Sequence, residues 1–182
     1  MDEDSRLVGK IQKHGDRAAA DTLIRKYYDE IYIYMYRQVT DKHKAMDLTQ
    51  DIFMSMLSSI CSYSPKQAGF RTWLYRIATN KVVDYYRSRA VHNKYFLETA
   101  ELEPYDETDF TRKFEADDLL ERVKAYVNGL DADTQKIFRL KFFAEYTFGE
   151  IAASLHMPES SVKSKYYRLL YRLKEEFKND YK

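Results

Sequence analysis

Apolar side chains recur at steps of three and four residues along most of this chain, and few residues interrupt the pattern. Ile24, Tyr27, Ile31 and Met35 illustrate the spacing, which places them on one side of a helix. The 182 residues include only 5 glycines and 3 prolines, which argues against a turn-rich all-β fold. We find no convincing strand and no internal repeat. The sequence therefore predicts an all-α fold.

Two breaks divide the helical pattern. Pro65 and Gly69 interrupt it in the segment SYSPKQAGF, where we expect a loop. The periodicity is lost again over residues 92–116, where the composition turns acidic, and we expect a linker there. The breaks predict two small helical domains, residues 1–91 and residues 117–182, joined by that linker.

The net charge of +1 conceals an uneven distribution of charge along the chain. Residues 1–97 carry a charge of +5, residues 98–118 carry −7, and residues 119–182 carry +3. Two basic blocks on either side of an acidic segment suit a polyanionic partner such as nucleic acid. Ordinary surface charge with an acidic linker remains the alternative.

Several classes of protein are disfavoured by composition. A single cysteine, Cys61, excludes an internal disulfide and any zinc site built from several cysteines. No apolar run approaches the roughly 18 residues of a membrane-spanning helix. The N-terminal residues lack the apolar core of a signal peptide. We therefore expect a soluble cytoplasmic protein without direct membrane insertion.

A helix-turn-helix is predicted near the C-terminus, with helices over Phe148–His156 and Ser160–Phe177. At 100° per residue, the arc of the second helix opposite its apolar side carries hydroxyl and basic groups: Ser164, Tyr167, Arg168 and Tyr171. Such a face can contact phosphates and base edges in the major groove of DNA. A plain helical hairpin with a solvated basic face is the alternative.

The turn of this motif contains an unusual residue, His156. Glycine is usual at this position because the backbone φ there is positive. Histidine tolerates a positive φ better than most residues, so we expect a cost of about 1 kcal/mol and an intact motif.

The segment Ala45–Ile60 predicts a helix with two distinct sides. One side is apolar, while the other carries Asp47, Gln50 and Asp51 with Met54 projecting into its middle. An exposed methionine surrounded by acids and an amide is typical of a protein-binding patch. A lone exposed methionine is the alternative, because exposed apolar residues are common.

A further helix is predicted over Arg71–Arg89, after the loop. Trp73, Arg76, Asn80 and Arg87 share one of its faces. A tryptophan beside such polar groups suits stacking on an unpaired base, which requires an opened strand or a flipped base. Alternatively, Trp73 is a buried anchor of the loop.

Three pieces of the sequence, in this order, resemble the sigma-70 family of bacterial RNA polymerase specificity factors. They are DLTQDIF, then WLYRIATNKVVDYYR after the loop, then EIAASL followed by SSVKSKYYRLLYRL. The likeness runs from about Leu23 to Phe177 and is greatest to the small two-domain, extracytoplasmic-function type. It implies a factor that binds core RNA polymerase and directs promoter recognition, strand opening and initiation. It implies no catalysis, no cofactor and no metal.

The resemblance also assigns roles to individual residues. It implies that the residues docking on the clamp coiled coil of core polymerase are Asp47, Gln50, Asp51 and Met54. It implies that the minus-ten element is recognised and melted by Tyr63, Phe70, Arg71, Trp73, Arg76, Asn80, Lys81 and Arg87. It implies that the minus-thirty-five element is recognised by Ser161, Lys163, Ser164, Lys165, Tyr167 and Arg168. Further implied partners are the polymerase flap, promoter DNA and an anti-sigma factor, typically membrane-anchored. The linker would thread polymerase channels.

Other functions stay open on the sequence alone. A stand-alone helix-turn-helix regulator would need a dimer interface or a sensor pocket, and the N-terminal half offers neither obviously. An adaptor or anti-sigma protein would lack promoter activity. An enzyme is disfavoured because the four histidines are scattered without metal-ligand spacing and no glycine-rich phosphate loop is present.

Overall fold

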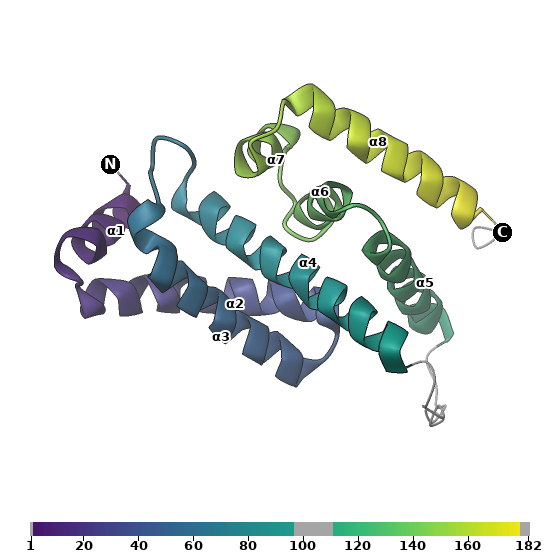
Figure 1. Cartoon of the computed structure of the whole chain (residues 1–182), viewed down its shortest axis with the longest axis horizontal. Coiled ribbons are helices and arrows are strands. Elements are labelled where there is room, and N and C mark those ends of the chain that lie inside the picture. The colour runs from purple at the N-terminus through teal and green to yellow at the C-terminus, as the bar shows by residue number, and fades with distance from the viewer. Residues whose placement is uncertain (1, 97–110, 179–182) are drawn as a thin grey trace.

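The structure, a computed structural model, describes residues 2–96 and 111–178, and the side chains within 2–89 and 118–178. All regular elements in these residues are helical, as predicted. The N-terminal module contains α1 (Glu3–His14), α2 (Arg17–Val39), α3 (Lys42–Ser59), the short 3₁₀ helix η1 (Ile60–Ser62) and α4 (Phe70–Phe96). The C-terminal module contains α5 (Thr111–Asn128), α6 (Ala132–Phe142), α7 (Phe148–Leu155) and α8 (Glu159–Glu176) (Figure 1).

The predicted linker, residues 92–116, overlaps helices at both of its ends. Helix α4 continues to Phe96 and α5 begins at Thr111. The central part of the predicted linker, residues 97–110, lies outside the described residues.

Aspartates start four of the described helices, including α1, where the side chain of Asp2 accepts from the backbone N–H of Ser5. The side chain of Asp16 accepts hydrogen bonds from backbone N–H groups at the start of α2, and Asp41 does the same for α3. Asp131 accepts one from the backbone N–H of Thr134 in α6. A side-chain cap of this kind contributes about 1 kcal/mol, because it pairs a backbone donor that the helix leaves free.

The core of the N-terminal module lies between α2, α3 and α4. Helix α2 packs on α1 and α3, and α3 packs on α4. Ile31, Met35, Ile52 and Leu74 are fully buried there. Ile31 and Met35 have the four-residue spacing on α2 that the sequence shows.

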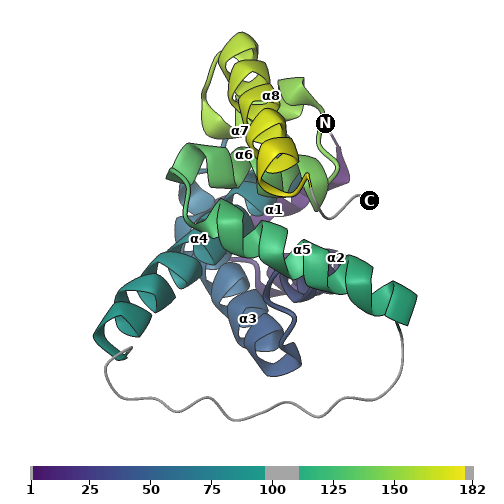
Figure 2. The same ribbon diagram turned by 90° about the vertical axis from the view of Figure 1, so that its right-hand side faces the viewer.

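The C-terminal module lies against α4. Helices α6 and α7 both contact α4, while α8 packs on α6 and α7 without lying on the N-terminal module (Figures 1 and 2). Val162 and Leu169 are buried and hold the inner side of α8 in place. The predicted helix-turn-helix is therefore present, and its first helix faces the other module.

The turn between α7 and α8 has the predicted backbone conformation. His156 adopts φ 53° and ψ 43°, the left-handed region that glycine occupies without strain. Its backbone N–H donates to the carbonyl of Ala152, which closes the last turn of α7.

Candidate protein and nucleic-acid interfaces

Helix α3 presents the predicted patch around Met54 to solvent. The Met54 side chain is 69% exposed, and Asp47, Gln50 and Asp51 are exposed beside it. These positions differ by three, four and seven residues, so they share one helix face. The predicted exposure of this set is confirmed.

The patch is wider than the sequence pattern indicates. Leu57 is an apolar residue that is 38% exposed and lies one turn after Met54. Asp51 is linked to α4 through an ion pair with Lys81 at 3.5 Å. The predicted polymerase-docking residues and a predicted DNA-binding residue are thus adjacent.

Three aromatic side chains of the predicted minus-ten set, including Trp73, which was expected to stack on an unpaired base, are buried. Tyr63, Phe70 and Trp73 are 6%, 2% and 7% exposed. The Trp73 ring centroid lies 5.2 Å from that of Tyr63 and 5.8 Å from that of Phe70. The expectation of an open aromatic surface is wrong for this arrangement. The three rings pack on one another between the base of the loop and α4, because this packing removes their apolar area from water. The alternative, Trp73 as a buried anchor, is the one observed.

The basic residues of the minus-ten set all have partners. Arg71 Nε donates to Glu30 Oε1 at 2.7 Å, and Arg76 Nη1 donates to His156 Nε2 at 2.6 Å. The remaining two pair with carboxylates at 3.5 and 3.8 Å: Lys81 with Asp51, and Arg87 with Asp84. Exposed ion pairs such as those of Lys81 and Arg87 contribute little stability, so these two side chains can exchange partners readily. Asn80 lies half-buried on the same helix.

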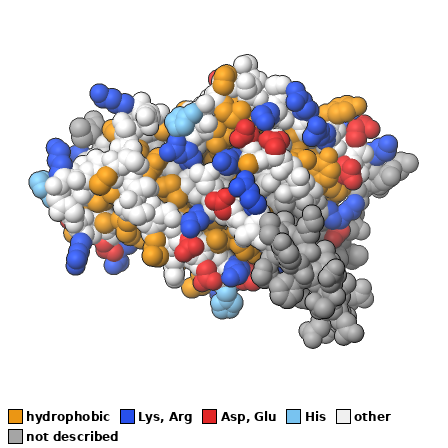
Figure 3. All heavy atoms as spheres, in the orientation of Figure 1, with side chains coloured by type: hydrophobic (Ala, Val, Ile, Leu, Met, Phe, Trp, Pro, Cys, Tyr) orange, Lys and Arg blue, Asp and Glu red, His pale blue; other side chains and the backbone are white. Residues whose placement is uncertain are grey.

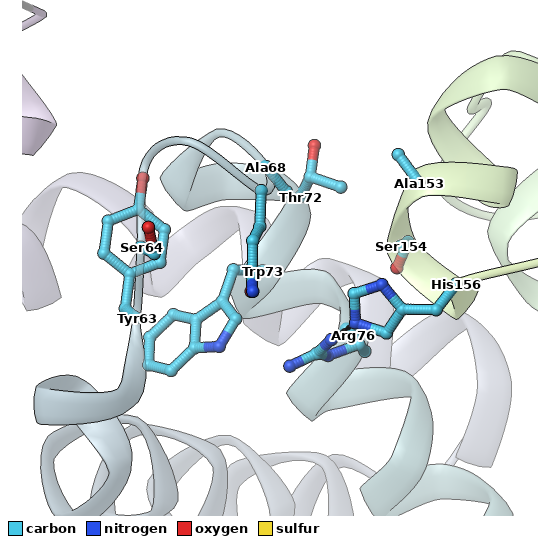
Figure 4. Close-up of a pocket in the computed structure, with 10 residues that line it drawn as sticks. Tyr63, Ser64, Ala68, Thr72, Trp73, Arg76, Ala153, Ser154 and His156 are labelled. Atoms are coloured by element: carbon cyan, nitrogen blue, oxygen red, sulfur yellow. Dashed lines mark hydrogen bonds between the residues drawn. The ribbon is translucent and has the colours of Figure 1, made fainter.

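Helix α7 lies over the predicted minus-ten surface (Figure 4). Ala153, Ser154 and His156 line a narrow cavity together with Trp73 and Arg76. The cavity volume is about 10 Å³, space for no more than one water molecule. A nucleic-acid base cannot enter it in this arrangement.

A second contact joins the modules through a cluster of aromatic and charged groups. Tyr75 of α4 and Tyr146 of the C-terminal module have ring centroids 5.3 Å apart, and the Arg71 guanidinium lies 4.6 Å and 5.3 Å from those two rings. Burial raises the pKa of Tyr75 and of Tyr146, so both phenols stay neutral at physiological pH. Glu30 accepts a hydrogen bond from the Tyr75 hydroxyl at 2.9 Å.

Sequence patterns did not identify Arg139, a buried cation between the two modules. Arg139 of α6 is 1% exposed, donates to Gln38 Oε1 of α2 at 2.7 Å, and also donates to Asn128 Oδ1. Its guanidinium lies 5.0 Å from the Tyr86 ring. Burial lowers its pKa from the ordinary value, which reflects the cost of holding a charge away from water. Its place among apolar neighbours in IFRLKFF gave no usable signal.

The outer face of α8 carries the predicted minus-thirty-five residues. Ser164, Tyr167 and Arg168 are exposed. Lys163 Nζ is 2.7 Å from Glu159, and Lys165 Nζ is 3.2 Å from Asp131. Ser161 lies half-buried in the first turn of α8. Figure 3 shows basic and acidic side chains interspersed on one face of the molecule, without a large field of one sign.

An apolar groove lies between α5, α6 and α8 and was not identified from the sequence. Its volume is about 690 Å³, and its apolar lining includes Val123, Phe138, Phe142, Leu170, Leu173 and Phe177. Phe142 and Leu170 are 55% and 41% exposed. The sequence signals for this groove were the paired phenylalanines of LKFF and the paired leucines of RLLY. Adjacent helical residues point in different directions, so only one member of each pair can face the core.

Two negative findings concern the described residues alone. Within residues 2–96 and 111–178, no group of three or more histidine, cysteine or acidic side chains is placed to hold a metal ion. In the same part of the chain, no helix is long and apolar enough to cross a membrane.

Two family models match the chain in the order of its modules. Sigma-70 region 2 matches residues 23–91, and Sigma-70 region 4 matches residues 120–173. The chain is 30% identical to the ECF RNA polymerase sigma factor SigW of Bacillus subtilis, over 86% of this chain and 87% of that protein. It is 27% identical to the RNA polymerase sigma-H factor of Pseudomonas aeruginosa, over 92% and 90% of the two chains.

Solved structures with a similar fold cover nearly the whole chain. CnrH, in complex with the cytosolic domain of CnrY, matches with a TM-score of 0.65 and 21% identity over 98% of this chain and 99% of that one. The sigma factor RpoE of Bartonella quintana, in complex with the anti-sigma factor NepR, matches with a TM-score of 0.55 and 18% identity, over 87% and 96% of the two chains.

Proposed function

The chain belongs to the sigma-70 family of RNA polymerase specificity factors, in its extracytoplasmic-function type, and we propose how its surfaces divide the work. As a sigma factor it binds core RNA polymerase and directs transcription initiation at promoters. We assign polymerase docking to the face of α3 that carries Asp47, Gln50, Asp51 and Met54. The single observation that carries this assignment is the exposed Met54 among polar neighbours, within the region-2 match.

Promoter contacts are divided between the two modules in this proposal. Residues 1–91 recognise and melt the minus-ten element, and residues 117–182 recognise the minus-thirty-five element through the outer face of α8. Duplex contacts by α8 set the register, since basic and hydroxyl side chains can contact phosphates and base edges. No bond is made or broken by this chain, so the protein is an initiation factor without catalysis of its own.

Strand opening uses the loop of residues 62–71 and the polar side of α4. Arg76, Asn80, Lys81 and Arg87 provide cationic and amide groups along that side. Tyr63, Phe70 and Trp73 support the surface from beneath, because their rings pack on one another. Unstacking a base costs roughly a few kcal/mol, which contacts of this surface with the displaced strand must offset.

Two further partners follow from the family. The apolar groove between α5, α6 and α8 offers a second contact to polymerase, at the flap. Its exposed Phe142 and Leu170 can be covered there. We also propose an anti-sigma factor as a regulatory partner. RpoE, which shares this fold, is described in complex with the anti-sigma factor NepR, and CnrH is described in complex with the cytosolic domain of CnrY.

Substitution of Met54 by alanine tests the docking assignment. We expect the affinity for core RNA polymerase to fall by about tenfold, because a central apolar anchor of an interface contributes more than 1 kcal/mol. Binding is measured by titrating labelled chain with purified core enzyme. Met54 is largely exposed, so the melting temperature should not change.

Met54→Leu is the matched control, since it keeps an apolar side chain of similar size, and we expect it to bind core enzyme nearly as well as the wild type. If the alanine variant and the wild type bind core enzyme with equal affinity, Met54 lies outside the docking interface.

A further inference from the structure

His156 connects the two modules by a side chain that the usual turn residue lacks. It ends α7 in the left-handed conformation, with φ 53°. Glycine there would relieve backbone strain but would have no side chain to reach α4. The His156 ring points at Arg76 across the gap between the modules (Figure 4). His156, whose backbone is strained, thus also contacts Arg76 of α4.

The chemistry of this contact fixes the state of the imidazole. Arg76 Nη1 lies 2.6 Å from His156 Nε2. A guanidinium has only donors, so Nε2 must accept and the ring must be neutral with its proton on Nδ1. A hydrogen bond from a charged donor is stronger than one between neutral groups. The contact therefore ties α7 to α4 through one directional bond.

The tie holds α7 over the surface proposed to meet the minus-ten element. Ala153 and Ser154 of α7 lie against the same cavity as Trp73 and Arg76. Ser154 is 2% exposed, and its hydroxyl has no partner among the described residues. An unpaired buried hydroxyl weakens this packing, because the group has lost its water without replacement. At this point α7 is held over α4 by the His156–Arg76 contact and by packing that contains an unpaired hydroxyl.

The Arg139 contact also points to an arrangement that can open. In the part of the chain that the structure describes, Arg139 forms no ion pair, and its Nε has no partner. A buried charge without a counter-ion favours states in which water reaches it. Separation of α6 from α2 would hydrate Arg139 and release Gln38.

We propose that His156 and Arg76 form a latch that keeps α7 over the minus-ten surface and so suppresses DNA binding by the free chain. The inference rests on the proposed function of that surface. Release of the latch frees Arg76 for nucleic acid and uncovers one edge of Trp73. The two modules can then separate to reach the two promoter elements.

Substitution of His156 by glycine tests the latch. Glycine suits the turn and removes the acceptor, so the fold of each module is kept. We expect the ratio of open to closed chain to rise about fivefold, which corresponds to roughly 1 kcal/mol. Trp73 is the single tryptophan of the chain, so quenching of its fluorescence by acrylamide reports the opening. Binding of a labelled single-stranded DNA oligonucleotide of random sequence should tighten by a similar factor where the closed form dominates.

His156→Gln is the matched control, because its side-chain oxygen can still accept from Arg76, and we expect it to behave like the wild type. Circular dichroism melting checks that both variants fold. If the glycine variant matches the wild type in quenching and in DNA binding, the latch is overturned.

Binding to core RNA polymerase separates this failure from failure of the proposed function. A wild-type chain that binds core enzyme keeps the function, whatever the glycine variant does. If the wild-type chain fails to bind core enzyme but the glycine variant opens, the contact between the modules is supported. The proposed function, on which the regulatory role of that contact depends, is then contradicted.

Discussion

Replacing Trp73 by alanine is expected to lower the free energy of unfolding by about 3–5 kcal/mol. Its ring is 7% exposed and packs against Tyr63 and Phe70, so truncation leaves a cavity at the base of the loop. The cavity adds to the lost burial, because a packed core relaxes only partly. Urea unfolding followed by circular dichroism measures the change.

Trp73→Phe is the matched control for this substitution. Phenylalanine keeps an aromatic ring in the cluster, so we expect a smaller loss of about 1–2 kcal/mol. An alanine variant as stable as the wild type would show that Trp73 lies outside the core. The size of the effect also changes how promoter assays are interpreted. Weak strand opening by the alanine variant could result from unfolding as well as from a lost contact with a base. The phenylalanine variant keeps the fold, so its promoter activity is the one to compare with the wild type.

Replacing Arg139 by alanine is the second large expected effect, with a loss of about 2–4 kcal/mol in the free energy of unfolding. Arg139 is among the largest fully buried side chains. Its removal leaves a cavity beside Tyr86 and leaves the side-chain oxygens of Gln38 and Asn128 without their donor. Both the cavity and the unpaired acceptors destabilise the packed modules. Thermal and urea unfolding measure the change.

Two further variants at this position separate packing from charge. Arg139→Met fills much of the space without a buried charge, so we expect it to be more stable than the alanine variant. Arg139→Lys keeps the charge but lacks the planar fork that reaches two acceptors, so we expect a stability nearer to that of alanine than to that of the wild type. Equal stability of the wild type and the alanine variant would contradict the observed burial.

The helices were predictable because their signals are local. Asp131 is a residue type that favours helix starts, and it caps α6. Val162 and Leu169 are seven positions apart, so they share one helix face, and both are buried on the inner side of α8. His156 takes the left-handed turn conformation that its place in the motif predicts. Met54 is exposed because the residues around it on its helix face are polar.

The covered surface was not predictable because its causes are not local. Helical periodicity correctly places Trp73 with Arg76 on one side of α4, but it does not say what lies against that side. The loop folds its own Tyr63 onto Trp73, and α7 brings His156 to Arg76 from 80 positions further along the chain. Arg139 was missed for the same reason, since its partner Gln38 lies 101 positions away.

Transcription by purified core RNA polymerase from a library of randomised promoter sequences tests the central claim most directly. With the chain present, we predict transcripts from a restricted set of sequences that share two elements at a fixed spacing, and none of these with core enzyme alone. A chain that neither associates with core enzyme nor selects any promoter sequence would contradict the assignment as a sigma factor.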